Sequence, residues 1–144
     1  MAAGVNAPTY TTEILCLAAS LEPPEALPRE DGAAELRSPT CGSTIRTVVM
    51  VDSSGRVEAL AQRVSACAFG QASAAILAQN GIGRDRAEVA AALAELSSWL
   101  AGERADPGSW PGLETLAPAR SKRGRHGAIL LPFRALAAAL ESAR

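Results

Sequence analysis

The residues that decide the fold are TIRTVVMV (44–51), DSSG (52–55) and VEALAQRV (57–64). The first stretch is rich in β-branched residues, which favours a strand, and DSSG is typical of the turn between two antiparallel strands. We therefore predict strands over Thr44–Val51 and Val57–Val64, joined as a hairpin. The shorter segment Ala33–Arg37 is predicted to add a third strand, which is the usual minimum for a small sheet covered by helices.

Helical patterns lie on both sides of this hairpin. A short amphipathic helix is predicted over Tyr10–Ser20, capped by Thr9 or Thr11, ahead of a proline-rich and acidic loop at residues 22–32. Further helices are expected over Phe69–Gln79, from Asp85 to Leu100, within 111–119, and over Leu131–Ser142.

The ends of these helices carry recognisable signals. Asp85 and Glu88 have the spacing of a capping box, and Asn80-Gly81 is typical of a helix C-terminus. Pro132 is expected in the first turn of the last helix, where proline is tolerated. Because strands and helices are segregated along the chain, we predict a single α+β domain over residues 1–144. Its architecture is a two-layer one, with helices covering a three-stranded antiparallel sheet.

Composition excludes several classes of protein. The chain has 144 residues, is 48% hydrophobic and 20% charged, and carries a formal net charge of −1. This balance predicts a globular protein that binds no nucleic acid and no membrane. Residues 1–12 lack the pattern of a secretory signal, which favours a cytoplasmic location.

Cysteine and histidine are scarce enough to consider one by one. The three cysteines are Cys16, Cys41 and Cys67, and the one histidine is His126. An odd cysteine count without a signal sequence favours free thiols in a reducing compartment. Cys16 lies within an apolar helical stretch, and we interpret it as a buried small hydrophobe. Cys41 lies in a turn between two strands, and Cys67 lies at a junction of strand and helix.

Several short motifs occur together between Ser38 and Ser73. They are Cys41-Gly42-Ser43, Val49-Met50-Val51-Asp52, Gly55-Arg56-Val57, Cys67 and Ala72-Ser73. In order and spacing this pattern resembles the U-type iron–sulfur cluster scaffold family, which includes IscU-like and SufU-like proteins and the N-terminal domain of NifU. The long stretch between Cys67 and the last helix is more similar to the SufU-type branch. The resemblance implies the α+β fold of that family and a role in iron–sulfur cluster assembly.

The resemblance also implies a set of ligands. Cys41, Cys67 and His126 take the positions of the family's metal-binding residues, with Ser43 contributing to cofactor binding. Thiolates and imidazole are suitable ligands for iron–sulfur clusters, and a helix beginning just after Cys67 favours its thiolate form. Two positions depart from the family: Ser43 replaces an aspartate, and Gly127 aligns with the third cysteine. A fourth ligand could therefore come from Ser43, water, a thiol cofactor or a second subunit of a homodimer.

Three functional hypotheses follow from the resemblance. The first is a scaffold that binds iron or a labile iron–sulfur cluster and hands it on, with no catalytic residues of its own. Its partners are then a cysteine desulfurase and recipient apoproteins. The second is a zinc-dependent sulfur-transfer protein of SufU type, and the third is a metal-free paralogue that binds or regulates a partner. For the basic run at residues 120–126, a solvated loop is the preferred interpretation and an acidic protein partner is the second. The resemblance implies contact of this loop with the sulfur-donating desulfurase.

Overall fold

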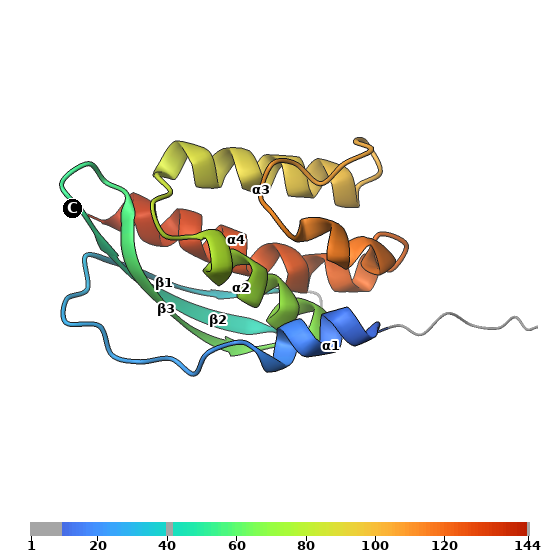
Figure 1. Ribbon diagram of the computed structural model, residues 1–144, viewed down its shortest axis with the longest axis horizontal. Helices are drawn as coiled ribbons and strands as arrows, with labels where there is room; N and C mark the ends of the chain where they lie inside the picture. The colour runs from blue at the N-terminus through green and yellow to red at the C-terminus, as the bar shows by residue number, and fades with distance from the viewer. Residues whose placement is uncertain (1–9, 40–41, 144) are drawn as a thin grey trace, which may run out of the picture.

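The computed structural model describes residues 10–39 and 42–143 (Figure 1). Along this part of the chain an N-terminal helix precedes three strands, which are followed by helices. The elements are α1 (Thr12–Ala19), β1 (Gly32–Arg37), β2 (Thr44–Val51), β3 (Val57–Ser65), α2 (Ala68–Asn80), α3 (Arg86–Leu100), the 3₁₀ helices η1 (Leu113–Ala119) and η2 (Arg123–Arg125), and α4 (His126–Ser142). This is the α+β arrangement that the sequence predicts.

The three strands form one antiparallel sheet in the order β1-β2-β3. All three predicted strands are confirmed, and the expected turn joins β2 to β3. In this turn the Asp52 carboxylate accepts hydrogen bonds from the backbone N–H groups of Ser54 (2.8 Å) and Arg56 (3.1 Å). Gly55 closes the turn with φ +80°, a left-handed conformation that glycine adopts without strain.

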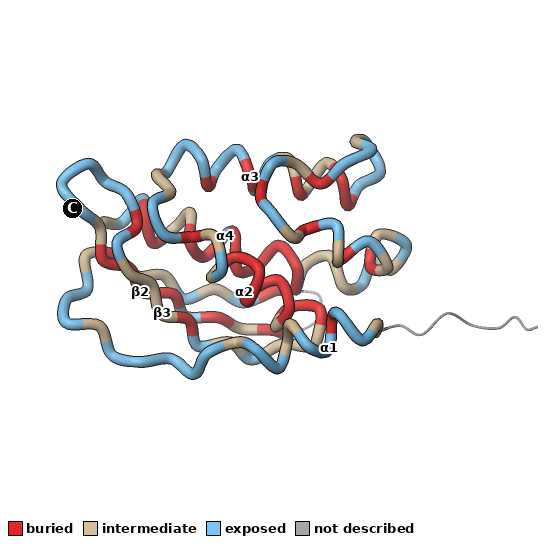
Figure 2. Tube along the Cα trace, viewed as in Figure 1, coloured by how far each residue is buried: buried red, intermediate tan, exposed pale blue. Residues whose placement is uncertain are grey.

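One face of the sheet is covered by helices. α4 packs against β1 and β2, α2 packs against β3 and α4, and α3 lies on the far side of α4 (Figure 1). Buried residues gather where the sheet meets α2 and α4 (Figure 2). On β2, Ile45 and Val49 are almost fully buried, and Ile45 packs in a cluster with Leu131 and Ala135 of α4. The sheet and its helical layer therefore share the main core.

Helix α4 begins five residues earlier than the sequence predicts. The expected start at Leu131 is wrong, because the helix runs from His126 and contains Pro132 in its interior. Proline has no N–H to donate to the carbonyl four residues earlier and normally disrupts a helix. The carbonyl that lacks this donor is that of Ala128. At the next residue the Ser73 hydroxyl on α2 donates a buried hydrogen bond of 2.6 Å to the Ile129 carbonyl. Tertiary contact with α2 thus supports the turn around the proline.

We predict that Ser73→Ala lowers the free energy of unfolding by about 1–3 kcal/mol. The substitution removes a donor to a carbonyl that is buried away from water, which costs more than losing an exposed hydrogen bond. Urea denaturation measures the effect. Ser97→Ala on α3 is the matched control and is expected to change stability by no more than about 0.5 kcal/mol, because the Ser97 side chain is partly exposed and makes no hydrogen bond with the described residues. Equal stability of the two variants would contradict the assigned role of Ser73.

Helix α1 presents a different face to the core than expected. Thr11 caps it by accepting a hydrogen bond from the Ile14 N–H at 3.1 Å, as one of the two predicted caps. Ile14 is fully buried, and the Tyr10 ring lies 5.0 Å from the Phe69 ring of α2. The predicted burial of Cys16 is wrong, since Cys16 is exposed. Residues two positions apart on a helix point to opposite sides, so the burial of Ile14 turns Cys16 outward.

The connection between α2 and α3 follows the sequence signals with one difference. Asp85 and Glu88 form the predicted capping box at the start of α3. Gly81 ends α2, but with the right-handed φ of −80° and not the left-handed conformation usual for such a glycine. A Cβ at this position would lie 2.8 Å from a Leu60 methyl group. The Leu77 carbonyl oxygen would lie 3.0 Å from the same Cβ, so close packing against β3 and the last turn of α2, and not a left-handed backbone, favours a small residue at this position.

Candidate functional site

Three segments that are distant in sequence meet at one end of the sheet. Thr44 at the start of β2 pairs with Ser65 at the end of β3, which places the β1–β2 loop beside the start of α2. The start of α2 lies against the start of α4, since a Cβ on Gly70 would lie 3.3 Å from the Ala128 Cβ. Figure 1 shows these three segments at the same end of the molecule. The candidate ligands come from these segments.

The β1–β2 loop is closed by its own backbone. The Ser38 N–H donates to the Ser43 carbonyl at 2.8 Å, and the Gly42 N–H donates to the Ser38 carbonyl at 3.2 Å. Gly42 has φ +74°, and no atom lies within 4 Å of a Cβ placed on it. The left-handed turn therefore explains the glycine. The Ser43 side chain is buried at the base of the loop, and the predicted ligand Cys41 lies outside the described residues.

Cys67 is the residue that caps α2. Its backbone is extended (φ −67°, ψ 173°), its carbonyl accepts the Gln71 N–H at 3.0 Å, and its side chain makes no capping hydrogen bond. The residue is half-buried and packs against the edge of the main core. The first N–H groups of a helix have no partners within the helix and favour a nearby negative charge. This position suits a thiolate ligand.

His126 is the first residue of α4, and its ring is turned toward the C-terminal end of η1. Its Nε2 atom lies 2.9 Å from the Ala119 carbonyl oxygen and 3.1 Å from that of Arg120. These carbonyls end η1, where helix carbonyl groups lack partners within the helix. The imidazole therefore pairs with carbonyl groups at the end of η1, while the backbone of His126 begins α4.

The described residues contain no group of three His, Cys, Asp or Glu side chains close enough to hold a metal ion. The structure places the backbones of Cys67 and His126 on adjoining helix starts, with Ser43 at the base of the neighbouring loop. The His126 side chain itself lines a surface hollow with Leu100, Gly102 and Arg120, and neither Cys67 nor Ser43 lines that hollow. The ligand set Cys41, Cys67 and His126, with Ser43 assisting, therefore stays a prediction.

The contacts of the Arg120 side chain with α3 were not predicted from the sequence. The solvated-loop interpretation is wrong for this residue, because its guanidinium donates hydrogen bonds to the Trp99 and Arg104 carbonyls, both at 3.1 Å. The guanidinium also lies over the Trp99 ring, 5.1 Å from its centroid. The basic run gave no local signal for this contact, because Trp99 and Arg104 are on α3 and the segment that follows it.

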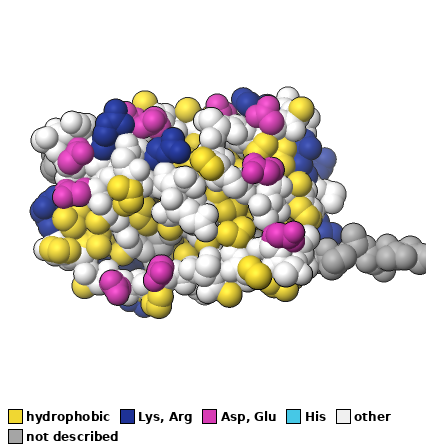
Figure 3. Space-filling model, in the orientation of Figure 1, with side chains coloured by type: hydrophobic (Ala, Val, Ile, Leu, Met, Phe, Trp, Pro, Cys, Tyr) yellow, Lys and Arg dark blue, Asp and Glu magenta, His cyan; other side chains and the backbone are white. Residues whose placement is uncertain are grey.

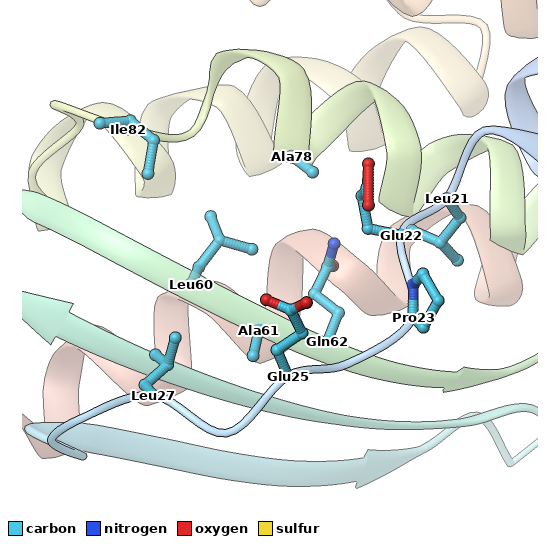
Figure 4. A pocket seen from close by; sticks show the side chains of 10 residues that line it. All are labelled: Leu21, Glu22, Pro23, Glu25, Leu27, Leu60, Ala61, Gln62, Ala78 and Ile82. Atoms are coloured by element: carbon cyan, nitrogen blue, oxygen red, sulfur yellow. The ribbon is translucent and has the colours of Figure 1, made fainter.

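A separate groove lies between β3, α2 and the proline-rich loop (Figure 4). Its volume is about 340 Å³, and its lining residues are Leu21, Glu22, Pro23, Glu25, Leu27, Leu60, Ala61, Gln62, Ala78 and Ile82. The Gln62 amide lies between β3 and α2, and its Nε2 donates to the Ala74 carbonyl at 3.0 Å. None of the candidate ligands lines this groove. We therefore do not include it in the candidate ligand site.

Charged side chains do not mark out a further site on the visible face of the molecule (Figure 3). On the face shown in Figure 3, acidic and basic side chains are interspersed, and no broad patch of one sign is visible. Among the described residues, no helix combines the length and the hydropathy needed to span a membrane.

Solved structures provide the informative comparisons. No protein-family model matches the chain, and no curated protein matches it significantly in sequence. The N-terminal part of a nitrogen-fixing NifU-like protein from Brucella abortus is similar, with 32% identity, a TM-score of 0.83 and coverage of 92% of each chain.

A putative iron–sulfur cluster assembly scaffold protein for the SUF system from Fervidobacterium islandicum AW-1 has a TM-score of 0.82. Its identity is 17%, with coverage of 92% of this chain and 96% of that one. A hypothetical protein has a TM-score of 0.67 at 23% identity, with coverage of 90% and 96%. At these identities the last two similarities concern the fold alone.

Proposed function

The chain belongs to the U-type iron–sulfur cluster scaffold family, and from that premise we propose that it binds iron or a labile iron–sulfur cluster and hands it on. One observation of the structure carries this proposal. The β1–β2 loop, Cys67 at the start of α2 and His126 at the start of α4 all lie at one end of the sheet. Loops and helix starts on a rigid sheet can present ligands together to a single cargo.

The donor chemistry supports iron and sulfide as cargo. Cys41 and Cys67 supply thiolates, which bind iron–sulfur clusters, and His126 supplies an imidazole nitrogen that suits iron as well as zinc. Gly127 follows His126 where the family has a cysteine, so three protein ligands are available before Ser43 or an external group is counted. An incomplete ligand set favours a cargo that is bound weakly and released readily, as a carrier requires.

The proposed partners follow from this role. A cysteine desulfurase supplies the sulfur, and recipient apoproteins take the cluster, so the protein acts as a carrier and not as an enzyme. A homodimer is one way to complete the coordination, because a second copy contributes two further thiolates. Size-exclusion chromatography of loaded and unloaded protein tests that arrangement.

The decisive experiment is analysis of iron, zinc and acid-labile sulfide in anaerobically purified protein after reconstitution with iron and sulfide. We expect iron and sulfide in the wild type and loss of most of both in Cys67→Ala, because that substitution removes a thiolate ligand. Cys16→Ala is the matched control and is expected to load like the wild type, since Cys16 is exposed on α1. Circular dichroism verifies that both variants are folded.

Other results would overturn the proposal in distinct ways. Zinc without sulfide, lost in Cys67→Ala, would indicate the zinc-dependent sulfur-transfer hypothesis. Absence of metal from the reconstituted wild type would indicate a paralogue that acts only through binding a partner. Equal loading of Cys67→Ala and Cys16→Ala would remove Cys67 from the ligand set.

A further inference from the structure

The hydrogen bonds of His126 decide which ring nitrogen is free. A carbonyl oxygen can only accept, so the Nε2 atom that faces the Ala119 and Arg120 carbonyls must carry a proton. In the neutral imidazole the other nitrogen, Nδ1, then has the lone pair. The described residues make no hydrogen bond to Nδ1. The ring is thus held in the tautomer whose Nδ1 lone pair is not used by the described residues.

The two carbonyls are themselves held in place. Ala119 is fully buried, and its carbonyl also accepts the Lys122 N–H at 2.9 Å. The carbonyl of Arg120 is fixed through the side chain of the same residue. That side chain is bound to the Trp99 and Arg104 carbonyls, both at 3.1 Å, and stacks on the Trp99 ring. Because Trp99 is only 3% exposed, it provides a rigid surface for the guanidinium.

We propose that Arg120 is a positioning residue that, through its own carbonyl and that of Ala119, holds the His126 imidazole with Nδ1 free to bind a metal ion. The part of this proposal that concerns metal binding rests on the proposed function. Partners that accept the second N–H of a ligating histidine fix its tautomer and ring orientation, and their loss weakens metal binding by roughly 10–100-fold. Arg120 is not itself a proposed ligand. It fixes the orientation of the His126 ring by attaching the end of η1, which carries the two carbonyl acceptors, to α3.

The first test is made on metal-free protein by NMR. With ¹⁵N-labelled histidine, the wild type is expected to show an Nε2–H proton protected from exchange with water by its two carbonyl acceptors. Arg120→Gln removes the fork of donors, so we expect this signal to broaden or disappear. Arg120→Lys keeps the charge without the planar fork and is expected to recover little of the signal. The matched control is Arg123→Gln in η2, because the Arg123 side chain makes no hydrogen bond or ion pair with the described residues.

The second test measures Co²⁺ affinity by anaerobic titration, with absorption as the readout. We expect Arg120→Gln to bind Co²⁺ about tenfold more weakly than the wild type, at the lower end of the range for such partners. Arg123→Gln is expected to bind as the wild type does. Thermal unfolding of each variant shows whether a change in affinity merely follows a loss of stability.

The two measurements separate the proposal from the proposed function. If the Nε2–H signal persists in Arg120→Gln, or if the signal is lost while Co²⁺ affinity is unchanged, Arg120 does not position the ligand and the inference fails. If the wild type shows the protected proton but binds neither Co²⁺ nor iron, the proposed function fails, and His126 serves only to cap η1.

Discussion

Gly127→Cys is expected to tighten Co²⁺ binding by roughly 100-fold. Loss of a residue that only hydrogen-bonds to a metal ligand weakens metal binding by roughly 10–100-fold, so a new direct ligand is expected to reach at least the upper end of that range. Gly127 is the second residue of α4, directly after His126. By resemblance it takes the position of the family's third cysteine. A thiolate at this position supplies a further strong donor, and a site with four ligands holds its metal more firmly than one with three. If the proposed function holds, the substitution is therefore expected to make the site retain a metal ion that the wild type releases readily.

The measurement is an anaerobic Co²⁺ titration followed by thiolate-to-cobalt absorption. Gly124→Cys is a close control, because it adds a thiol three residues earlier, where a Cβ has no neighbour within 4 Å. It is expected to leave the affinity unchanged. If both variants tighten binding equally, the effect comes from an added thiol in general and the alignment of Gly127 with the family's cysteine is wrong. If neither does, Gly127 lies outside the site.

Trp110→Ala is expected to lower the free energy of unfolding by about 3–5 kcal/mol, as large-to-small substitutions of buried aromatic residues do. Trp110 lies in the segment between α3 and η1, yet it is only 2% exposed. Its ring packs edge-on against Phe133 at a centroid distance of 5.2 Å, and its Nε1–H donates to the Ile76 carbonyl at 3.2 Å. The Arg84 guanidinium lies 4.5 Å from the ring centroid on another side.

This single side chain thus joins α2, α4 and the α2–α3 connection. Urea denaturation measures the loss, which corresponds to a decrease in Tm of about 10–15 °C for a domain of this size. Trp110→Phe keeps most of the apolar contact and loses the hydrogen bond, so we expect a smaller loss of about 1–2 kcal/mol. Leu15→Ala, at a site 49% exposed, is expected to change stability by no more than about 0.5 kcal/mol. A loss below 1 kcal/mol in Trp110→Ala would show that the segment is not fixed by this residue.

Local signals were sufficient for much of the fold. The β-branched run over Thr44–Val51, the turn around Asp52 and the capping box of Asp85 and Glu88 each act over a few residues, so the sequence displays them directly. Signals of this kind failed where a distant segment changes the local preference. The early start of α4 despite Pro132 depends on packing against α2, and the exposure of Cys16 depends on which side of α1 meets the core.

The candidate site, like the fold, was predicted from the sequence only in part. Its residues were identified from motif spacing and family resemblance, and the structure places Ser43, Cys67 and His126 at one end of the sheet. The orientation of His126 had no signal in the sequence, because the atoms that fix it belong to η1 and, through Arg120, to α3. Cation–π contact between Arg120 and Trp99 joins residues far apart in the chain, and the basic run by itself favoured a solvated loop.

The sequence alone determined the fold class, the order of the elements and the family, because these depend on short patterns and on the spacing of a few motifs. The tertiary structure decided which side of each helix is buried, where α4 begins and which nitrogen of His126 is free. These features depend on contacts between segments that meet only when the chain has folded. The candidate ligands were therefore identified from the sequence, while the orientation of their side chains is a property of the packed structure.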